Sequence, residues 1–551
     1  MSASTPVSTL KRSTALAIAL TIGLMLGACS RSPTGGEQTA PAKPNLTTAN
    51  MLVRGNGPEP DSLDPQKART FEAATVLRDM YECLTALGKD AGAVPALATG
   101  WAVSTDGRTY TFKLRSEARW SNGDRVVAAD VVAGLQRLVD PKTAAQYAQV
   151  VDVIENASDI VAGKKPPNTL GVTTPDEATV VIQLKSPAPY LPSLLTHPST
   201  CPIHRGELAR LGDEAFKPGK HISNGAFVLQ EWVQGSHIQL QRNHRYWNDA
   251  ATHLDGVRFV SNADENAEFN RYRGGELHTT AVVPRTQFAQ VKQEYGQQLH
   301  LGPQLGTNYY GFNLDREPFK SQPGLRRALS LVIDRERLVE AVTQVGELPA
   351  YSWVPPGIYN YGTQAFDYRG KPMADRIREA RALYAVAGYS AAKPLHFELR
   401  YNTGKVQEKL AVAVASMWTQ ALGVDVKLAA EEFKVLLRSI DARSVDIFRS
   451  SWIGDYNDPY TFAQYLKGNF GINLPHYHSA IYDELLAKAA AEVDVAKRRG
   501  MLEQAERTML ADHPLLPLYF YVNKHLVSPR VHGWYDNVMN VVYSKDLSLD
   551  P

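Results

Sequence analysis

The hydrophobic and polar positions of residues 445–453 (VDIFRSSWI) show a mixed alternation, with β-branched and aromatic side chains on both faces. This period of two predicts a strand. The sequence Gly-Asp-Tyr-Asn-Asp-Pro at 454–459 follows, and its residue types predict the turn that ends the strand. The predicted strand therefore carries Arg449 and Trp452 and places Asp455 at its exit.

Similar patterns predict elements along the rest of the chain. Residues 51–66 predict a strand that leads into a loop, and helical spacing over 73–87 predicts a helix. Asp106-Gly107 predicts a hairpin turn between two strands, and a further helix is expected from about Ala128. Three more helices and one strand are predicted in the later part of the chain, at 325–345, 405–422, 480–512 and 424–428 respectively.

The first 28 residues predict an export signal rather than part of the fold. Lys11 and Arg12 precede a short apolar run, 16–25, and small residues follow it. The run is too short to span a membrane. The sequence Leu-Gly-Ala-Cys at 26–29 resembles the lipobox of bacterial lipoproteins, which implies acylation of Cys29; cleavage and release is the alternative. Residues 29–45, rich in Pro, Gly, Ser and Thr, predict a flexible tether.

Composition narrows the function classes. About 500 mature residues predict roughly three domain-sized units. The formal charge of the whole chain is +2, and it falls to zero once Lys11 and Arg12 leave with the signal. Such a balance gives no argument for nucleic acid as a partner. With Cys29 acylated, Cys83 and Cys201 remain, and the sequence leaves open whether they form a disulfide or two buried thiols.

Arg449 and Asp455 are candidate binding residues because of their separation. Six residues span about 20 Å of extended backbone, so the two charges cannot pair directly. They could meet the two ends of a zwitterion laid between them, and a short peptide is such a zwitterion. The alternative is that both are ordinary solvated charges beside a core strand.

Motifs of catalysis and metal binding are not found. The sequence contains neither a Gly-x-Ser-x-Gly elbow nor a His-Glu-x-x-His helix, and residues 212–220 lack phosphate-loop spacing. His476 and His478 could offer two ligands from one face of a strand, but a third is not evident. We therefore expect no enzyme activity, no cofactor and no metal.

Several segments together resemble one family. SLDP (62–65), TDGRTYTFKLR (105–115), WSNGD (120–124) and GDYNDP (454–459), with others in collinear order over about 50–530, resemble the peptide-binding proteins of ABC importers, solute-binding family 5. The likeness is greatest to the oligopeptide-binding members. It implies an α/β, two-lobed periplasmic-binding-protein fold (type II, cluster C) with mixed sheets, an extra small domain and a hinge.

The resemblance also implies domain boundaries. One lobe would comprise 46–81, 206–306 and 523–551, a small domain 82–205, and the second lobe 307–522. If Cys83 and Cys201 pair, their disulfide would join the two chain crossings of the small domain. The disulfide positions of the oligopeptide-binding relative correspond to Tyr309 and Ile453, so that bridge is absent here.

Roles for individual residues follow from the same resemblance. Asp455 would bind the α-ammonium of a peptide and Arg449 its carboxylate. Backbone groups of Ser451 and Ile453 would pair with the peptide main chain by strand addition, with the loop around Arg69 and Phe71 as the opposite rail. The residues that match pocket-lining positions are Tyr147, Phe433, Leu437 and Trp452.

The chain departs from the family pattern at three of these positions. Gln407 stands where the oligopeptide-binding relative has a histidine that meets the carboxylate of longer peptides. Arg69 and Phe433 replace a glutamate and a tryptophan. These changes leave the preferred length and charge of the peptide open.

The resulting expectation is a monomeric, lipid-anchored binding protein of the periplasm or cell envelope. It would capture short peptides and present them to an ABC permease in the inner membrane, without a nucleic-acid partner. The alternatives are a dipeptide, a murein peptide or another solute such as a metal complex as ligand, and a lipid-anchored peptide hydrolase.

Overall fold

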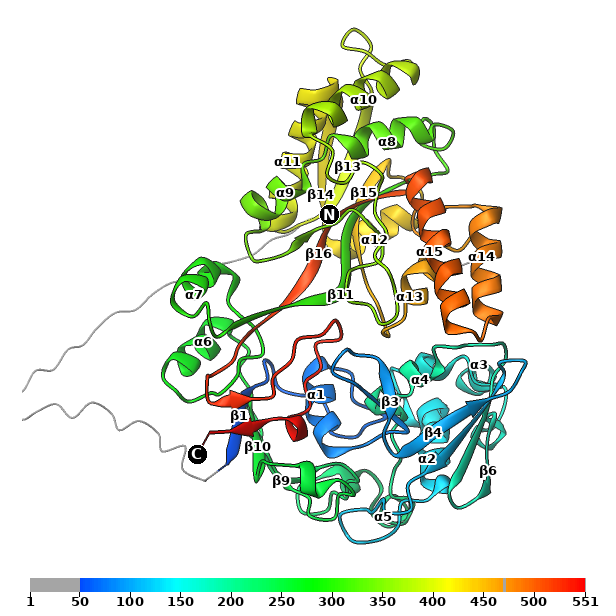
Figure 1. Ribbon diagram of the computed structural model, residues 1–551, viewed down its shortest axis with the longest axis vertical. Coiled ribbons are helices and arrows are strands. Elements are labelled where there is room, and N and C mark those ends of the chain that lie inside the picture. The colour runs from blue at the N-terminus through cyan, green and yellow to red at the C-terminus, as the bar shows by residue number, and fades with distance from the viewer. Residues whose placement is uncertain (1–49, 469–471, 551) are drawn as a thin grey trace, which may run out of the picture. The chain divides into compact units, whose positions relative to one another are not determined.

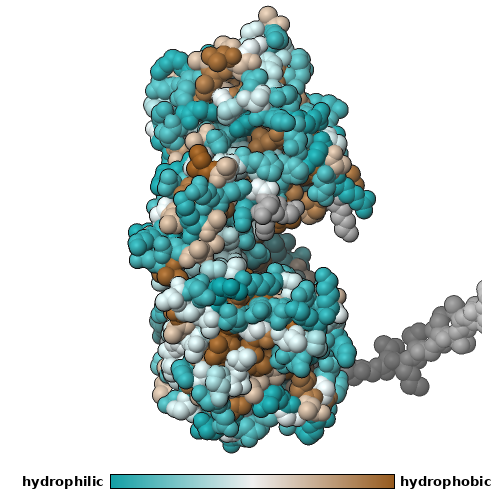
Figure 2. All heavy atoms as spheres, turned by 90° about the vertical axis from the view of Figure 1, so that its right-hand side faces the viewer, coloured by the Kyte–Doolittle hydropathy of each residue, from teal (hydrophilic) through white to brown (hydrophobic). Residues whose placement is uncertain are grey.

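The computed structural model describes residues 50–468 and 472–550 (Figure 1). The expected signal segment 1–28, Cys29 and the tether 29–45 lie outside the described residues. Within the described ranges, helices that combine the length and the apolar character of a membrane span are not found. On the face drawn in Figure 2, hydrophilic side chains cover most of the surface and the hydrophobic ones form separate patches.

A four-stranded sheet joins the start of the chain to a later segment. Its order is β1 (Met51–Gly55), β10 (Gly256–Val260), β9 (His237–Arg242) and β8 (Phe227–Val233), with β1 and β10 parallel and the other pairs antiparallel. Helices α1 (Phe71–Met80), α6 (Glu265–Arg273) and α7 (Phe288–Glu294) belong to the same segments. The Thr70 hydroxyl caps α1 by accepting a hydrogen bond from the Ala73 amide.

A second four-stranded sheet lies between these segments in the sequence. Its order is β4 (Ala98–Val103), β5 (Thr109–Leu114), β7 (Thr179–Gln183) and β6 (Val172–Asp176). Gly107, with φ +67°, makes the predicted hairpin turn between β4 and β5. The amphipathic helix α2 (Ala128–Val139) buries Val131, Leu135 and Leu138 in the core it shares with this sheet. The shorter elements here are β2 (Thr85–Leu87), β3 (Ala93–Pro95), α3 (Ala157–Val161), α4 (Leu191–Leu194) and α5 (Arg205–Leu211).

The candidate strand lies in the largest sheet. Its order is β12 (Leu348–Pro349), β16 (Leu515–Leu526), β11 (Leu299–Phe312), β15 (Ile447–Ile453), β13 (His396–Asn402) and β14 (Asp425–Glu431). Antiparallel pairs join β12, β16, β11 and β15, and parallel pairs join β15, β13 and β14. The helices of this part are α8 (Pro323–Leu331), α9 (Arg335–Leu338), α10 (Met373–Val386), α11 (Lys405–Leu422), α12 (Phe433–Asp441), α13 (Tyr460–Ala463), α14 (Ala480–Ala491) and α15 (Val495–Asp512).

Strands β11 and β16 connect this sheet to the rest of the chain. Their antiparallel pairing runs from Leu299 opposite Leu526 to Gly311 opposite Leu515, and its register shifts between Pro303 and Thr307. In Figure 1 the two strands run side by side into the large sheet. A register irregularity offers a place where two adjacent strands can bend at little cost in ladder hydrogen bonds, as a hinge requires.

Two predicted helices are wrong in their extent, because polar side chains start a new helix inside each. The stretch 325–345 divides into α8, α9 and a π-helical turn, and the Asp334 carboxylate caps α9 by accepting from the Arg337 amide. The stretch 480–512 divides into α14 and α15, since the Asp494 carboxylate accepts from the amides of Ala496 and Lys497.

The helix predicted over 73–87 is also wrong in its extent. It begins at Phe71 and ends at Met80, and residues 85–87 form β2 instead. Tyr81 is already extended, and both backbone groups of Glu82 bond to the Asn224 side chain. A tertiary contact therefore replaces the helical hydrogen bonds that the apolar spacing suggested.

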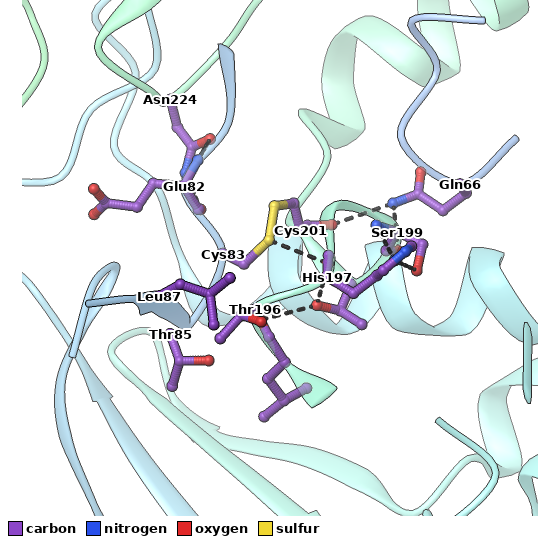
Figure 3. The surroundings of a disulfide bond; sticks show 12 residues. Gln66, Glu82, Cys83, Thr85, Leu87, Thr196, His197, Ser199, Cys201 and Asn224 are labelled. Atoms are coloured by element: carbon purple, nitrogen blue, oxygen red, sulfur yellow. Dashed lines mark hydrogen bonds between the residues drawn. A yellow bond between two sulfur atoms is a disulfide. The ribbon is translucent and has the colours of Figure 1, made fainter. Parts of the chain in front are cut away.

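Cys83 and Cys201 form a disulfide (Figure 3). Their Cα atoms lie 4.2 Å apart although 118 residues separate them in sequence. The Gln66 side-chain amide donates to the carbonyl oxygens of Ser199 and Cys201, both at 3.2 Å, and so orders the segment that carries the second cysteine. The alternative of two free thiols is therefore wrong.

Candidate ligand-binding site

Strand β15 has a regular pairing along one edge. Ile453 lies opposite Gly306 and Ile447 opposite Phe312, and the Gly454 amide donates to the Leu305 carbonyl at 2.8 Å. Because backbone groups alternate in direction along a strand, the even-numbered residues of β15 bond to β11. The backbone N–H and C=O groups of Arg449, Ser451 and Ile453 therefore point away from β11.

The other edge of β15 is paired over only part of its length. β13 meets β15 at Ile447 and Phe448 and at no later residue of the strand. Residues 449–453 consequently present an unpaired edge, with the outward backbone groups spaced as a ladder requires. Such an edge can accept an extended chain as an added strand.

Arg449 is buried, and it has no acidic partner among the residues that the structure describes. Its exposed fraction is 8%, and its guanidinium donates to the Asn402 side-chain oxygen and to the Tyr521 hydroxyl, both at 3.1 Å. Its Nε has no hydrogen-bond partner within the described part of the chain. Because both of these partners are neutral, a ligand carboxylate could be the first anion to pair with this guanidinium.

Asp455 follows directly after β15 and its carboxylate is unpaired. Among residues 50–468 and 472–550, no side chain or amide forms a hydrogen bond or ion pair with it. The side chain is open to solvent, yet partial burial by the surrounding protein raises the pKa of the Asp455 carboxyl above its usual value. A carboxylate in this state gains from the approach of a cation, because a cation removes the cost of its lost hydration.

The turn that carries Asp455 is held by two hydrogen bonds to Thr461. The Thr461 hydroxyl accepts from the Asp455 amide at 3.2 Å, and the Thr461 carbonyl accepts from the Trp452 indole N–H at 3.0 Å. The Trp452 ring is half-buried and lies 4.9 Å from the ring of Tyr465, centroid to centroid. Thr461 therefore fixes the turn while leaving the Asp455 carboxylate free.

A stack of aromatic rings joins this turn to the 82–205 segment. Tyr190 stacks on Tyr456 with ring centroids 4.8 Å apart and on Tyr460 with centroids 5.4 Å apart. The Asn457 side-chain amide donates to the Ala91 carbonyl at 2.7 Å. The segment after Asp455 thus rests on two distant parts of the chain, which the sequence did not reveal.

The predicted opposite rail lies at the start of α1. Arg69 pairs with Asp61 at 3.0 Å, and the Arg69 carbonyl accepts from the Tyr147 hydroxyl at 3.3 Å. Phe71 is half exposed. Arg69, Phe71 and Tyr147 line one cavity, which includes neither Arg449 nor Asp455. Arg69, Phe71 and Tyr147 thus lie together, and Arg449 and Asp455 lie on β15 and at its exit. Within the described residues, a direct contact between these two sets of residues is not found.

Gln407, Phe433 and Leu437 come from two helices of the large-sheet segment. Gln407 lies in the first turn of α11, and its side-chain oxygen is buried without a partner among the described residues. Phe433 begins α12 and is 49% exposed, and Leu437 lies one turn later on the same helix. The exposed phenylalanine is therefore available for contact with a ligand, whereas the Gln407 side-chain oxygen would first have to become accessible.

Sequence reasoning missed the residues that position the two charges. Asn402 ends β13 and Tyr521 lies in β16, and neither strand was among the predicted elements. The alternation of Tyr519 and Tyr521 in the sequence LYFYVN is the signal that could have shown one polar ring edge facing the site. Thr461 gave no signal, since a threonine after a turn is ordinary.

The two histidines considered as metal ligands lie in a loop rather than on a strand. His476 has φ +55° and its Nδ1 lies 2.7 Å from the Asp315 carboxylate. Within the part of the chain that the structure describes, groups of three His, Cys, Asp or Glu residues arranged to hold a metal ion are not found.

Comparison with known proteins places the chain in a family. Residues 92–473 match the family described as "Bacterial extracellular solute-binding proteins, family 5 Middle". The chain is 37% identical, over 499 residues, to the periplasmic oligopeptide-binding protein OppA of Escherichia coli, covering 90% of this chain and 91% of that one. This protein therefore belongs to solute-binding family 5, and the predicted α/β fold class is confirmed.

Two solved structures illustrate the similarity. The unliganded open form of MppA, a periplasmic murein tripeptide-binding protein, is 36% identical and superposes with a TM-score of 0.88, covering 91% of this chain and 97% of that chain. The OppA of Haemophilus influenzae in complex with the peptide RPPGFSPFR is 35% identical, with a TM-score of 0.66 and coverage of 91% and 99%.

Proposed function

We propose that this protein is the extracytoplasmic binding component of an ABC importer and that it captures short oligopeptides by their backbone and termini. The observation that carries the proposal is the open edge of β15. Among the described residues, the Asp455 carboxylate at its exit is unpaired and the Arg449 guanidinium within it has no acidic partner. A peptide laid along this edge would place its ammonium at Asp455 and its carboxylate toward Arg449. Relatives that bind oligopeptides and a murein tripeptide support the ligand class.

The same arrangement would let the protein bind peptides that have different side chains. Ladder hydrogen bonds involve only the main chain of the ligand, so they do not distinguish one residue from another. Trp452, Phe433, Leu437 and Tyr147 would then meet the ligand side chains in pockets where water fills unused volume. Gln407, a neutral amide, would bind the carboxylate of a longer peptide less strongly than a cation does.

The protein acts in the periplasm or cell envelope, as a monomer held to a membrane through a lipid on Cys29, and presents its closed form to a permease of the inner membrane. Replacing Cys29 by Ala would release the protein from the membrane fraction. Retention of the Cys29→Ala variant in that fraction would contradict the lipid anchor without touching the peptide site.

The ligand class is tested by calorimetry with unmodified alanine peptides of two to six residues, followed by mass spectrometry of each mixture. We expect saturable binding of the three- to five-residue peptides and recovery of every peptide intact. Absence of binding across the series would contradict peptide capture. Shortened products would show a hydrolase instead.

A further inference from the structure

A cavity of about 140 Å³ lies between the start of α1 and the segment 197–199. A cavity of this size has room for several water molecules, or for a small polar group in their place. Its walls come from three stretches of the chain that are distant in sequence. The lining residues that matter for its chemistry are Arg69, Phe71, Arg78, Tyr147 and His197.

Arg78 gives the cavity an uncompensated positive charge. Among the described residues it forms neither a hydrogen bond nor an ion pair, and its Nε is buried without a partner. Arg78 as a whole is only half-buried, but its buried Nε has lost hydration without gaining a partner in return. An anion entering the cavity would supply the missing partner.

His197 adds a neutral hydrogen-bond donor to the same wall. Its Nδ1 accepts from the Ser199 amide at 3.2 Å, so the ring proton of the neutral form lies on Nε2. Burial, reinforced by the charge of Arg78, lowers the pKa of His197 to about 3, which keeps the ring neutral. Its Nε2 forms no hydrogen bond within the described part of the chain and is available to a ligand.

The rest of the wall suits a short carbon chain that ends in an anion. Phe71 and Tyr147 contribute aromatic surface, and Arg69, whose side chain is 60% exposed, adds a second cation beside its partner Asp61. Aspartate and glutamate are absent from the described residues that line the cavity. Methylene groups would pack on the rings while a carboxylate meets the donors.

We propose that this cavity is a subsite for an acidic side chain, glutamate or aspartate, of a bound peptide. The inference rests on the proposed function, because Arg69 and Phe71 also belong to the predicted rail for the peptide backbone. Free inorganic anions share the recognised chemistry, but a peptide side chain also uses the aromatic walls. The subsite would therefore favour a negatively charged side chain at one position of the peptide. At the other positions the protein would recognise only the peptide backbone.

The test compares glutamate with glutamine, which has nearly the same shape but no charge. Tetraalanine and its eight single variants, with Glu or Gln at each position, are titrated into the wild-type protein by calorimetry. We expect one position at which Glu binds at least tenfold more tightly than Gln, and near equality elsewhere. Equal affinity for Glu and Gln at all four positions would overturn the subsite.

Variants locate the effect. Arg78→Gln should abolish the preference for Glu and leave the affinity for tetraalanine within twofold. Arg210→Gln, which removes an exposed charge from α5, is the matched control and should keep the preference. A preference that survives in Arg78→Gln would overturn the assignment. If Arg78→Gln fails to fold, the wild-type series decides, and Arg78→Lys should retain part of the preference.

Inorganic phosphate, titrated alone and in competition, separates the two sources of an anion. We expect phosphate to weaken binding of the preferred Glu peptide and to leave tetraalanine unaffected. Phosphate binding without any Glu preference would overturn the assignment to a peptide side chain. Tetraalanine that binds without a Glu preference contradicts only the subsite, whereas failure of every peptide to bind contradicts the proposed function as well.

Discussion

Arg498 of helix α15 donates two hydrogen bonds to the Asp458 carboxylate, at 2.7 and 2.8 Å, three residues after Asp455. Only 10% of the Arg498 side chain and 14% of the Asp458 side chain are exposed. The pair fixes the second acidic residue of the turn and leaves the first without a partner. Two aspartates of one turn thus have separate tasks, one structural and one open to a ligand.

Replacing Arg498 by Gln should destabilise the protein through this pair. A nearly buried carboxylate that loses its counter-ion costs about 3–5 kcal/mol. Denaturant unfolding followed by circular dichroism measures the change. Arg499→Gln, at an exposed position whose ion pair with Glu503 is 3.6 Å long, is the matched control and should cost less than about 1 kcal/mol. Equal losses in the two variants would contradict a structural role for the pair.

Arg449→Gln should weaken the binding of tripeptides while leaving the fold intact. The loss of charged hydrogen bonds to the ligand carboxylate corresponds to about 1.5–3 kcal/mol, or about 10- to 150-fold in affinity. Calorimetry with trialanine measures the effect, and amidated trialanine should bind the variant and the wild type alike. Arg378→Gln, which removes a charge from an exposed position of α10, should leave affinity unchanged. An unaltered affinity of Arg449→Gln for trialanine would remove this residue from the site.

The disulfide should contribute strongly to stability. Cys83 and Cys201 close a loop of 118 residues, and a covalent link of that length restricts the unfolded chain. Replacing both by Ser should lower the free energy of unfolding by about 2–5 kcal/mol. Thermal unfolding with and without a reductant provides the measurement, and reductant should lower the melting temperature of the wild type alone. A reductant effect of equal size in the double variant would show that it acts elsewhere.

Glu506 should make stability depend on pH. It is buried in α15, where it accepts from the amides of Trp353 and Val354, both at 2.8 Å, and burial raises the pKa of its carboxyl to about 7. A raised pKa in the folded state means that the stabilising contribution is complete below about pH 4.5 and is lost as the pH rises through 7.

The Glu506→Gln variant isolates this contribution. Between pH 5 and pH 8 the wild type should lose about 2.5 kcal/mol relative to the variant, as the linkage relation gives for these two pKa values. Denaturant unfolding of both proteins at the two pH values measures the difference. Glu484→Gln, at an exposed site, should behave as the wild type does. Parallel pH profiles for the wild type and Glu506→Gln would contradict a raised pKa.

The sequence predicted the elements whose pattern is local. The alternation at 445–453, the Asp106-Gly107 turn and the helix 405–422 all depend on neighbouring residues, and the structure has each of them. The helices predicted at 325–345 and 480–512 are too long, because apolar spacing continues across residues whose side chains cap a new helix. Asp334 and Asp494 show that a cap decides where a helix divides when the hydrophobic pattern does not.

The site could be predicted only in part, for a similar reason. Arg449 and Asp455 stand out because their separation along one strand is a local quantity. Whether these charges are left without a partner of opposite charge is not a local property. It depends on Asn402, Tyr521 and Thr461, which come from other elements. The cavity with Arg78 and His197 depends on the packing of segments more than 100 residues apart, for which the sequence offers no pattern.

The central claim is that the Asp455 carboxylate recognises the free ammonium of a peptide. Calorimetry with trialanine and N-acetyl-trialanine on the wild type and on Asp455→Asn tests it most directly. Loss of a charged partner in such a site costs about 2–5 kcal/mol, so acetylation should weaken binding to the wild type by about 30-fold or more and have little further effect on the variant. Equal affinity of the wild type for the two peptides would contradict the claim.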